Sequence, residues 1–175
     1  MKHRFTNVFL FLIPFLLLFL SCQPKEKQSL TEEEAIVILN RLMETLSNTD
    51  TVLVDEIIHP DCVLRYPILP EPIKGIDAYK KFVKSTANTF SEFKGKVEEV
   101  NVKGDRIWSR YSMSGINTGP LGKIPATGEK FQVTGMGITR IEDGKIIEDE
   151  TYWNVLGFFQ QLGFTLLPPK TETDL

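Results

Sequence analysis

The chain has 175 residues, a formal net charge of −3 and a hydrophobic content of 42%. A chain of this length fits one domain built around one hydrophobic core. The small net charge, without a cluster of Lys or Arg, argues against a nucleic-acid partner. Neither histidine has metal-ligand spacing: His3 is near the N-terminus, and His59 precedes Pro60 at an expected helix end.

The first 21 residues have the pattern of an export signal. Residues 1–4 are cationic, and residues 8–20 form an uncharged apolar run. The run is shorter than the ~20 apolar residues that a bilayer-spanning helix needs, and a polar segment follows it at once. We therefore predict that residues 1–21 are a cleaved signal peptide. An uncleaved membrane anchor and an ordinary secretory cut are the alternatives.

The end of this signal, Phe19-Leu20-Ser21-Cys22, resembles the lipobox of bacterial lipoproteins. The resemblance implies that Cys22 receives a lipid and that residues 22–30 are a lipidated cysteine and a polar tether. Each buried CH₂ contributes about 0.8 kcal/mol, so several acyl chains anchor a protein to a membrane. The implied location is the cell envelope. Gln23 favours the outer membrane in a cell that has one, since an Asp there would favour the inner membrane.

Helices are expected first in the mature chain. Thr31-Glu32-Glu33-Glu34 has the pattern of a capping box and predicts a helix start. Apolar residues then recur at spacings of three and four as far as Leu46, which places them on one buried stripe. A second, shorter helix is expected over residues 52–58, and a third with Asp77 as its N-cap.

Cys62 lies in a strand-like run, residues 62–66, between the second and third helices. With Cys22 used by lipid, it has no partner for an intrachain disulfide. A small buried hydrophobe is therefore its expected role.

The hydrophobic period changes to two from residue 97 onward. This change predicts strands over residues 97–103, 106–116, 131–141 and 145–155. Gly104 and Gly144 supply positive φ for tight antiparallel hairpins. Residues 119–128 are rich in Gly and Pro and predict a long ordered loop at the mouth of the sheet. Helices followed by strands predict an α+β fold, with helices on one face of a curved antiparallel sheet.

Four stretches of the second half resemble the SnoaL-like polyketide cyclase or ester cyclase family. They are Gly115-Ile116-Asn117-Thr118-Gly119, residues 122–128, residues 135–148 and Tyr152-Trp153-Asn154-Val155-Leu156. The resemblance implies a nuclear transport factor 2-like cone over residues 31–165, followed by a tail over residues 166–175. It also implies a deep apolar pocket for a small, largely apolar molecule. Cone folds often form homodimers through the outer face of the sheet, and the resemblance extends that expectation to this chain.

The chemistry of a cyclase indicates which residues to look for. An aldol ring closure needs a base that removes a proton α to a carbonyl and a donor for the oxygen, and a carboxyl group of raised pKa in an apolar pocket can serve both steps. No metal or cofactor is required. In the family the carboxylate is usually an aspartate of the last strand, and the aligned position here is Thr151. Many relatives also carry a histidine where this chain has Asn117.

Strand alternation limits which side chains can replace that aspartate. If Thr151 faces the pocket, Asp149 and Trp153 share its face. Epoxide hydrolases of the same cone use an Arg and two Asp, and only the arginine, Arg110, is matched here; alternation groups Trp108 with it. The catalytic candidates are therefore Asp149, Arg110 and Thr151, and the ligand-binding candidates are Arg65, Trp108, Asn117 and Trp153. Each has a structural alternative, such as a core tryptophan or an ion pair between Arg110 and Asp149.

Two functions are compatible with this sequence. One is a binding module that keeps the cone without the chemistry. The other is an enzyme with acid/base chemistry on a carbonyl compound, in which Asp149 carries the proton and Arg110 orients the substrate. Thr151 favours the binding module, because a threonine hydroxyl has no useful basicity near neutral pH. The predicted lipid anchor favours it too, since polyketide assembly is ordinarily cytoplasmic.

Overall fold

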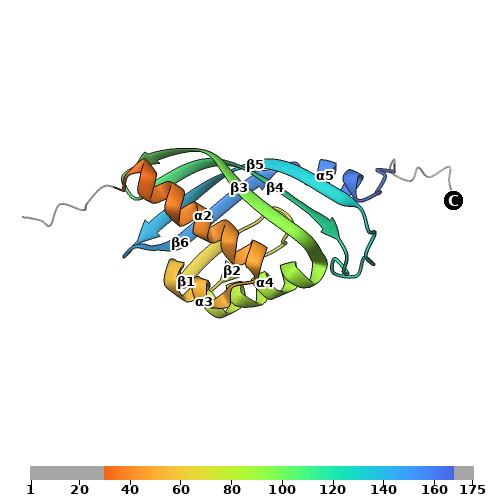
Figure 1. The fold of residues 1–175 in the computed structure, drawn as a ribbon, viewed down its shortest axis with the longest axis horizontal. Helices are drawn as coiled ribbons and strands as arrows, with labels where there is room; N and C mark the ends of the chain where they lie inside the picture. The colour runs from red at the N-terminus through yellow and green to blue at the C-terminus, as the bar shows by residue number, and fades with distance from the viewer. Residues whose placement is uncertain (1–29, 168–175) are drawn as a thin grey trace, which may run out of the picture.

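Residues 30–167 are described by a computed structural model of the protein, and they form four helices on one six-stranded sheet (Figure 1). The helices are α2 (Glu32–Asn48), α3 (Thr51–Ile57), α4 (Ile76–Thr89) and α5 (Val155–Gln161). The strands are β1 (Ile58–Arg65), β2 (Ile73–Lys74), β3 (Phe90–Lys103), β4 (Arg106–Asn117), β5 (Lys130–Glu142) and β6 (Lys145–Trp153). The predicted signal peptide, Cys22 and the tether up to residue 29 lie outside the described residues, as do residues 168–175.

The capping box at the start of α2 is confirmed. The Thr31 hydroxyl accepts a hydrogen bond from the Glu34 backbone N–H at 3.2 Å, and the Thr31 N–H donates to the Glu34 carboxylate at 2.9 Å. Two orphan amides of the first turn are thereby satisfied. The apolar stripe behind the cap, which includes Ala35, Leu39 and Leu42, is buried against the sheet.

Two expected helix boundaries lie elsewhere. α3 ends at Ile57, and β1 begins at once and carries Pro60 in an irregular stretch between its paired residues, where a missing N–H is tolerated. The N-cap of α4 is Gly75. Its φ of 83° is a conformation that residues with a side chain rarely adopt, which explains the glycine at this position. Asp77, the expected cap, lies in the first turn, where its charge suits the helix dipole.

The strands are ordered β2-β1-β6-β5-β4-β3. Neighbours are antiparallel except β1 and β6, which pair in parallel, so the sheet is mixed where the sequence predicted an antiparallel one. Gly104 and Gly144 have positive φ in their hairpins, as predicted. The register of β3 shifts near Glu92, which has a φ of 50°, and such bulges bend a strand. β3 accordingly curves strongly in Figure 1, and its bend helps the sheet to form a concave face.

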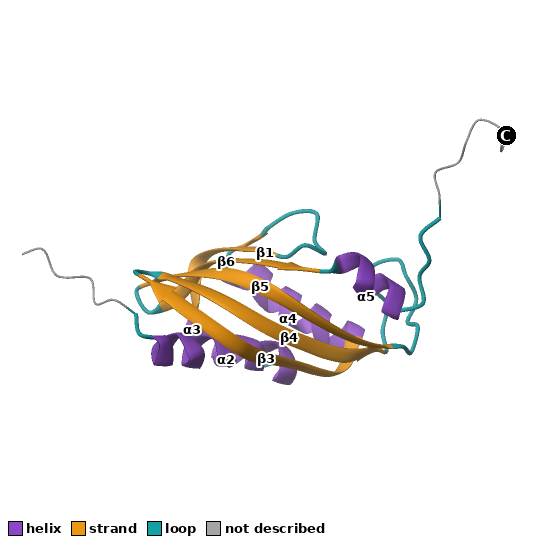
Figure 2. Ribbon diagram, turned by 90° about the horizontal axis from the view of Figure 1, so that it is seen from above, coloured by secondary structure: helices purple, strands orange, loops and turns teal. Residues whose placement is uncertain are grey.

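Helices α2, α3 and α4 cover the concave face, with α2 lying along β3 (Figures 1 and 2). The last strand, expected over residues 145–155, ends at Trp153, and α5, which the sequence did not predict, follows it. α5 closes the far end of the sheet, opposite the first turn of α2. Cys62 is fully buried in the core between these layers, as expected. The α+β class with a curved sheet on N-terminal helices is confirmed. None of the helices within residues 30–167 is long and apolar enough to cross a membrane.

Candidate functional site

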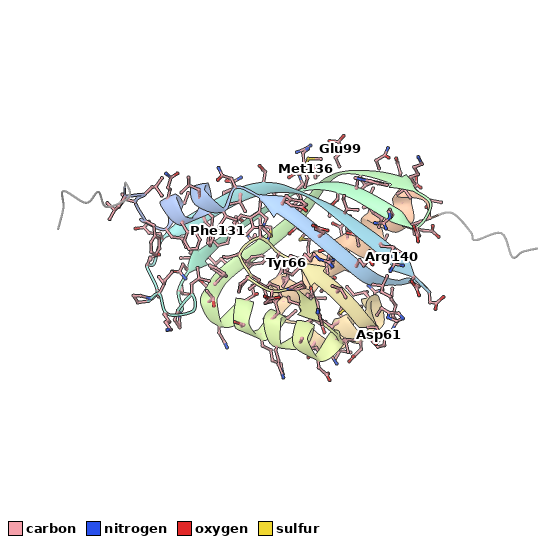
Figure 3. The ribbon with its side chains drawn as sticks, turned by 180° about the vertical axis from the view of Figure 1, so that it is seen from behind. Asp61, Tyr66, Glu99, Phe131, Met136 and Arg140 are labelled. Carbon is pink, nitrogen blue, oxygen red and sulfur yellow. The ribbon has the colours of Figure 1, made fainter. Side chains whose placement is uncertain are left out.

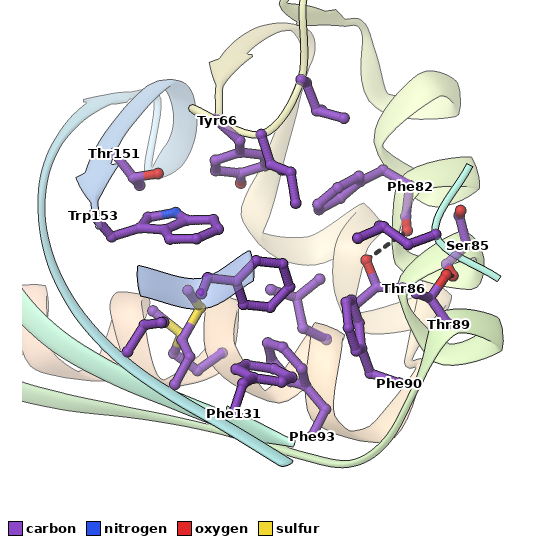
Figure 4. A pocket seen from close by; sticks show the side chains of 18 of the residues that line it. Tyr66, Phe82, Ser85, Thr86, Thr89, Phe90, Phe93, Phe131, Thr151 and Trp153 are labelled. Carbon is purple, nitrogen blue, oxygen red and sulfur yellow. Dashed lines mark hydrogen bonds between the residues drawn. The ribbon is translucent and has the colours of Figure 1, made fainter. Parts of the chain in front are cut away.

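A cavity of about 500 Å³ lies between the concave face of the sheet and the helices (Figure 4). This volume is in the range of small-molecule sites. Its walls are largely apolar and aromatic. The aromatic members are Tyr66, Phe82, Phe90, Phe93, Tyr111, Phe131, Trp153, Phe158 and Phe159. Leu121 and Ile124 of the predicted long loop also line it, which places that loop against the cavity.

Aromatic rings from four elements, β3, β5, β6 and α5, meet at the α5 end of the cavity. Phe131 of β5 contacts Phe90 of β3 and Phe158 of α5, with ring centroids 5.1 Å apart in both pairs. Trp153 meets Phe158 edge to face at 5.4 Å. Edge-to-face pairs at such distances stabilise a packed aromatic wall. This end of the cavity can therefore hold a flat or apolar molecule, but it offers no charged group.

Asp149 supplies the single carboxylate among the described residues that line the cavity. Only 3% of the residue is exposed, and the Thr139 hydroxyl donates a hydrogen bond to its Oδ1 at 2.7 Å. Burial raises the pKa of Asp149 from 3.8 to about 6, while hydrogen bonding to Thr139 and Tyr66 lowers it in part. Both protonation states are thus accessible near neutral pH, as a general acid or base requires.

Two tyrosine hydroxyls accompany this carboxyl group. Burial raises the pKa of Tyr111 to about 12, and the Thr151 hydroxyl, which lies nearby without meeting hydrogen-bond geometry, opposes the rise. Burial, with the neighbouring Tyr79 and Asp149, raises the pKa of Tyr66 well above its usual range. Both hydroxyls therefore keep their protons at physiological pH and are neutral hydrogen-bond donors.

The structure brings together three of the candidates expected from the sequence. Asp149, Thr151 and Trp153 follow one another on one face of β6, and all three line the cavity, as strand alternation predicted. Same-face neighbours on a strand are roughly 7 Å apart, so the three side chains form a row along the cavity wall that runs from Asp149 to the aromatic rings at Trp153. What each of them does in the cavity remains a prediction.

The expectation that Arg110 and Trp108 face the pocket is wrong. The pairing register aligns Trp153 with Gly135, and Gly135 with Tyr111, so the pocket face of β4 carries Tyr111 and not its neighbour Arg110. Arg110 is half-exposed on the outer face, and its Nε lies 3.3 Å from Glu99. Figure 3 shows Glu99 pointing outward on this face, whereas Tyr66 lies inside. An ion pair between Arg110 and Asp149 is thereby excluded.

Arg65 and Asn117 also lie outside the cavity. Arg65 is exposed at the end of β1, and it is the next residue, Tyr66, that lines the cavity. Asn117 is fully buried and fastens the following loop: its amide donates to the Thr89 and Gly119 carbonyls at 3.2 and 2.8 Å, and its carbonyl accepts from the Thr127 N–H at 2.8 Å. Its role is to hold the loop beside the cavity.

Sequence reasoning missed Tyr66 and Tyr111. A signal for Tyr111 was present, because Ile107, Tyr111 and Met113 occupy odd positions in a segment whose even positions include two arginines and two serines. No such signal marks Tyr66, which follows the last residue of β1 in a Pro-rich stretch. Within residues 30–167, no group of three or more His, Cys, Asp or Glu side chains could hold a metal ion.

The model of the SnoaL-like polyketide cyclase family matches residues 36–162. An aklanonic acid methyl ester cyclase from Streptomyces peucetius is 29% identical over 131 residues, which are 73% of this chain and 90% of that protein. A nogalonic acid methyl ester cyclase from Streptomyces nogalater is 30% identical over 112 residues, 63% of this chain and 83% of that protein. The structure of TsrD from Streptomyces laurentii superposes with a TM-score of 0.68 at 25% identity, covering 77% of this chain and 98% of that one. The nuclear transport factor 2-like cone is confirmed.

Proposed function

The chain belongs to the SnoaL-like polyketide cyclase family, and from that premise we propose that its cavity binds a small, largely apolar carbonyl compound on which Asp149 performs acid/base chemistry. The observation that carries the proposal is the position of Asp149. A buried carboxyl group with a pKa of about 6 lies in the wall of an apolar cavity of about 500 Å³. Such a group is matched to proton transfer near neutral pH.

The proposed step is proton removal next to a carbonyl group. The Asp149 carboxylate takes a proton from the carbon α to the carbonyl, and the electron pair of that C–H bond moves toward the carbonyl oxygen to give an enolate. Protonated Asp149 then returns the proton to the same carbon or to another atom of the compound. The two curated relatives are named as cyclases of methyl esters, and ring closure through such an enolate is the corresponding reaction proposed here.

The charge of the cavity narrows the class of compound. Among the described residues that line it, none is Lys, Arg or His. A carboxylate or phosphate in the compound would face Asp149 without a compensating cation, and an unpaired buried charge is costly. A neutral ketone or ester meets no such penalty. We therefore propose a neutral carbonyl compound and not a fatty acid or a phosphate ester.

Deuterium exchange tests this step without the natural substrate. Acetylnaphthalene is a small neutral aromatic ketone, and in D₂O a base beside its α-carbon exchanges the methyl protons for deuterium. We expect the full chain to accelerate this exchange and Asp149→Asn to lose roughly 10²–10⁴-fold of the acceleration, the usual contribution of a general base. Mass spectrometry of the recovered ketone measures the rate.

The matched control is Glu148→Gln. Glu148 neighbours Asp149 in the chain, but it pairs with Arg140 at 3.0 Å instead of lining the cavity. Its loss should leave the exchange rate unchanged. Ketone that binds without exchange in the unaltered protein would refute the acid/base step.

A binding module without turnover is the second candidate. It is favoured by Thr151, which lines the cavity at the position where the family pattern has an aspartate. In that case acetylnaphthalene binds and Asp149→Asn changes neither its affinity nor its exchange. We also propose, from the resemblance of residues 19–22 to a lipobox, that the domain works at the cell envelope on a lipid anchor. Incorporation of a radioactive fatty acid into the full chain, and its loss in Cys22→Ala, tests the anchor.

A further inference from the structure

Tyr111 carries a buried hydroxyl that the fold leaves unused. Only 2% of the residue is exposed, and its ring lines the cavity. Among residues 30–167, its hydroxyl is the one buried side-chain polar atom without a hydrogen-bond partner. The other buried tyrosine of the core, Tyr79, is satisfied by the Thr45 hydroxyl at 3.1 Å. Buried polar groups are nearly always paired, so an unpaired one indicates a missing partner.

Glycine at position 135 makes room for this hydroxyl. A Cβ added to Gly135 would lie 2.6 Å from the Tyr111 oxygen and 2.7 Å from the Tyr152 carbonyl oxygen. Gly135 pairs with Tyr111 on one side and with Trp153 on the other. The Tyr111 side chain therefore leans across Gly135 toward the row of β6 side chains that lines the cavity.

The chemistry of this group is that of a hydrogen-bond donor. Burial keeps the pKa of Tyr111 near 12, so the hydroxyl holds its proton at any physiological pH. The Asp149 carboxylate accepts hydrogen bonds, whereas Tyr111 offers one. The end of the cavity beside β6 thus presents a base and a free donor, which are the two groups that enolate formation needs.

We propose that Tyr111 donates a hydrogen bond to the carbonyl oxygen of the bound compound, which places the α-carbon toward Asp149. The inference rests on the proposed function. It gives Tyr111 the substrate-orienting role that the sequence predicted for Arg110, because Arg110 lies on the outer face. Because the hydroxyl is itself buried, binding in this mode requires the neighbouring Thr151 side chain to move aside. The substrate class is then a neutral aromatic or alicyclic ketone or ester with its oxygen directed at β4.

A matched pair of compounds isolates this hydrogen bond. Acetylnaphthalene and isopropenylnaphthalene have nearly the same shape, but only the ketone has an acceptor oxygen. We expect Tyr111→Phe to weaken ketone binding about 3- to 10-fold, the usual net value of one hydrogen bond, and to leave binding of the hydrocarbon unchanged. The infrared carbonyl stretch of the bound ketone should move to higher frequency in the variant, a change that a merely structural role would not produce.

Stability gives an independent readout. Removal of an unpaired hydroxyl should leave the melting temperature of the free protein unchanged or raise it, whereas Tyr79→Phe removes a satisfied hydroxyl and should lower it. Unchanged ketone affinity and carbonyl frequency in Tyr111→Phe would overturn the inference and leave binding in the cavity intact. If neither compound binds the unaltered protein, the proposed function itself fails, and the inference fails with it.

Discussion

Glu148 and Asp149 are neighbours in β6, yet the two faces of the sheet move their pKa values in opposite directions. On the outer face, hydrogen bonding to Arg140 lowers the pKa of Glu148. On the inner face, burial raises the pKa of Asp149 to about 6. Two carboxylic acids one residue apart therefore have different chemistry, because one is paired and near solvent and the other is buried without a cation. The side of the strand decides what the residue can do.

The inner face also carries polar groups whose burial lowers the stability of the fold. Asp149 and Tyr111 are polar groups held in an apolar wall, one without a counter-ion and the other without a hydrogen-bond partner. The outer face has no such burden, since ion pairs such as Arg140 with Glu142 lie near solvent. If this contrast is correct, substitutions on the inner face should trade function against stability, and those on the outer face should change little.

The largest expected effect on stability follows from Asp149. Its pKa is about 6 in the folded protein and near 3.8 when solvated, so the folded state binds the proton more tightly. The stability that this proton provides is complete below about pH 4 and is lost as the pH rises through about 6, a difference of about 3 kcal/mol. Asp149→Asn cannot ionise and can still accept from Thr139. We expect it to be more stable than the unaltered protein by up to about 3 kcal/mol at about pH 8, and equally stable at about pH 4, in urea unfolding.

Glu148→Gln is the control on the outer face of the same strand. It removes a carboxylate whose pKa is lowered, so its effect on stability should have the opposite sign: a small loss at neutral pH that disappears in acid. Equal stability of Asp149→Asn and the unaltered protein at both pH values would show that Asp149 is well solvated. The contrast between the two faces would then fail.

The sequence predicted one strand of this site correctly and misassigned the next. In β6, the alternation of Asp149, Thr151 and Trp153 was sufficient, because the resemblance placed Thr151 on the pocket face and alternation then placed the other two. In β4, the resemblance to epoxide hydrolases at Arg110 predicts the wrong parity. Serines at both odd and even positions weaken the alternation there, and the resulting one-residue error exchanges the two faces.

The role of Asn117 could not be predicted for a different reason. Its partners, Thr89, Gly119 and Thr127, come together only when the loop after β4 meets the end of α4. No local pattern contains that information. The helix caps were more accessible, since a capping box such as Thr31 with Glu34 is local, although the start of α4 at Gly75 shows that backbone conformation can prevail over the side-chain preference.

Two glycines on the inner face of β5, Gly135 and Gly137, predict stability effects of intermediate size. An added Cβ at Gly135 would lie within 2.7 Å of the Tyr111 ring and of a backbone oxygen, whereas at Gly137 the nearest atoms are at 3.4 Å. Gly135→Ala should cost about 1–3 kcal/mol of stability through overpacking. Gly137→Ala should be close to neutral. Thermal unfolding of both variants measures the difference.

The same pair reports on Tyr111. Because a Cβ at position 135 pushes the tyrosine ring away from its present site, Gly135→Ala should weaken ketone binding together with stability, while Gly137→Ala should not affect the Tyr111 hydroxyl. Equal behaviour of the two variants would mean that Tyr111 does not depend on the space over Gly135.

The smallest effect is expected on the outer face, from Arg110→Ala. Arg110 is half-exposed and pairs with the exposed Glu99, and a pair of this kind contributes roughly 0–1 kcal/mol in solution. We expect a loss of stability of about 0.5 kcal/mol or less, which salt should reduce further. Deuterium exchange of acetylnaphthalene should proceed at the unaltered rate, because the strand places Arg110 on the face opposite Tyr111 and the cavity. A loss of exchange as large as that expected for Asp149→Asn would instead place Arg110 in the reaction, and it would show that strand parity in β4 does not separate the chemistry of the two faces.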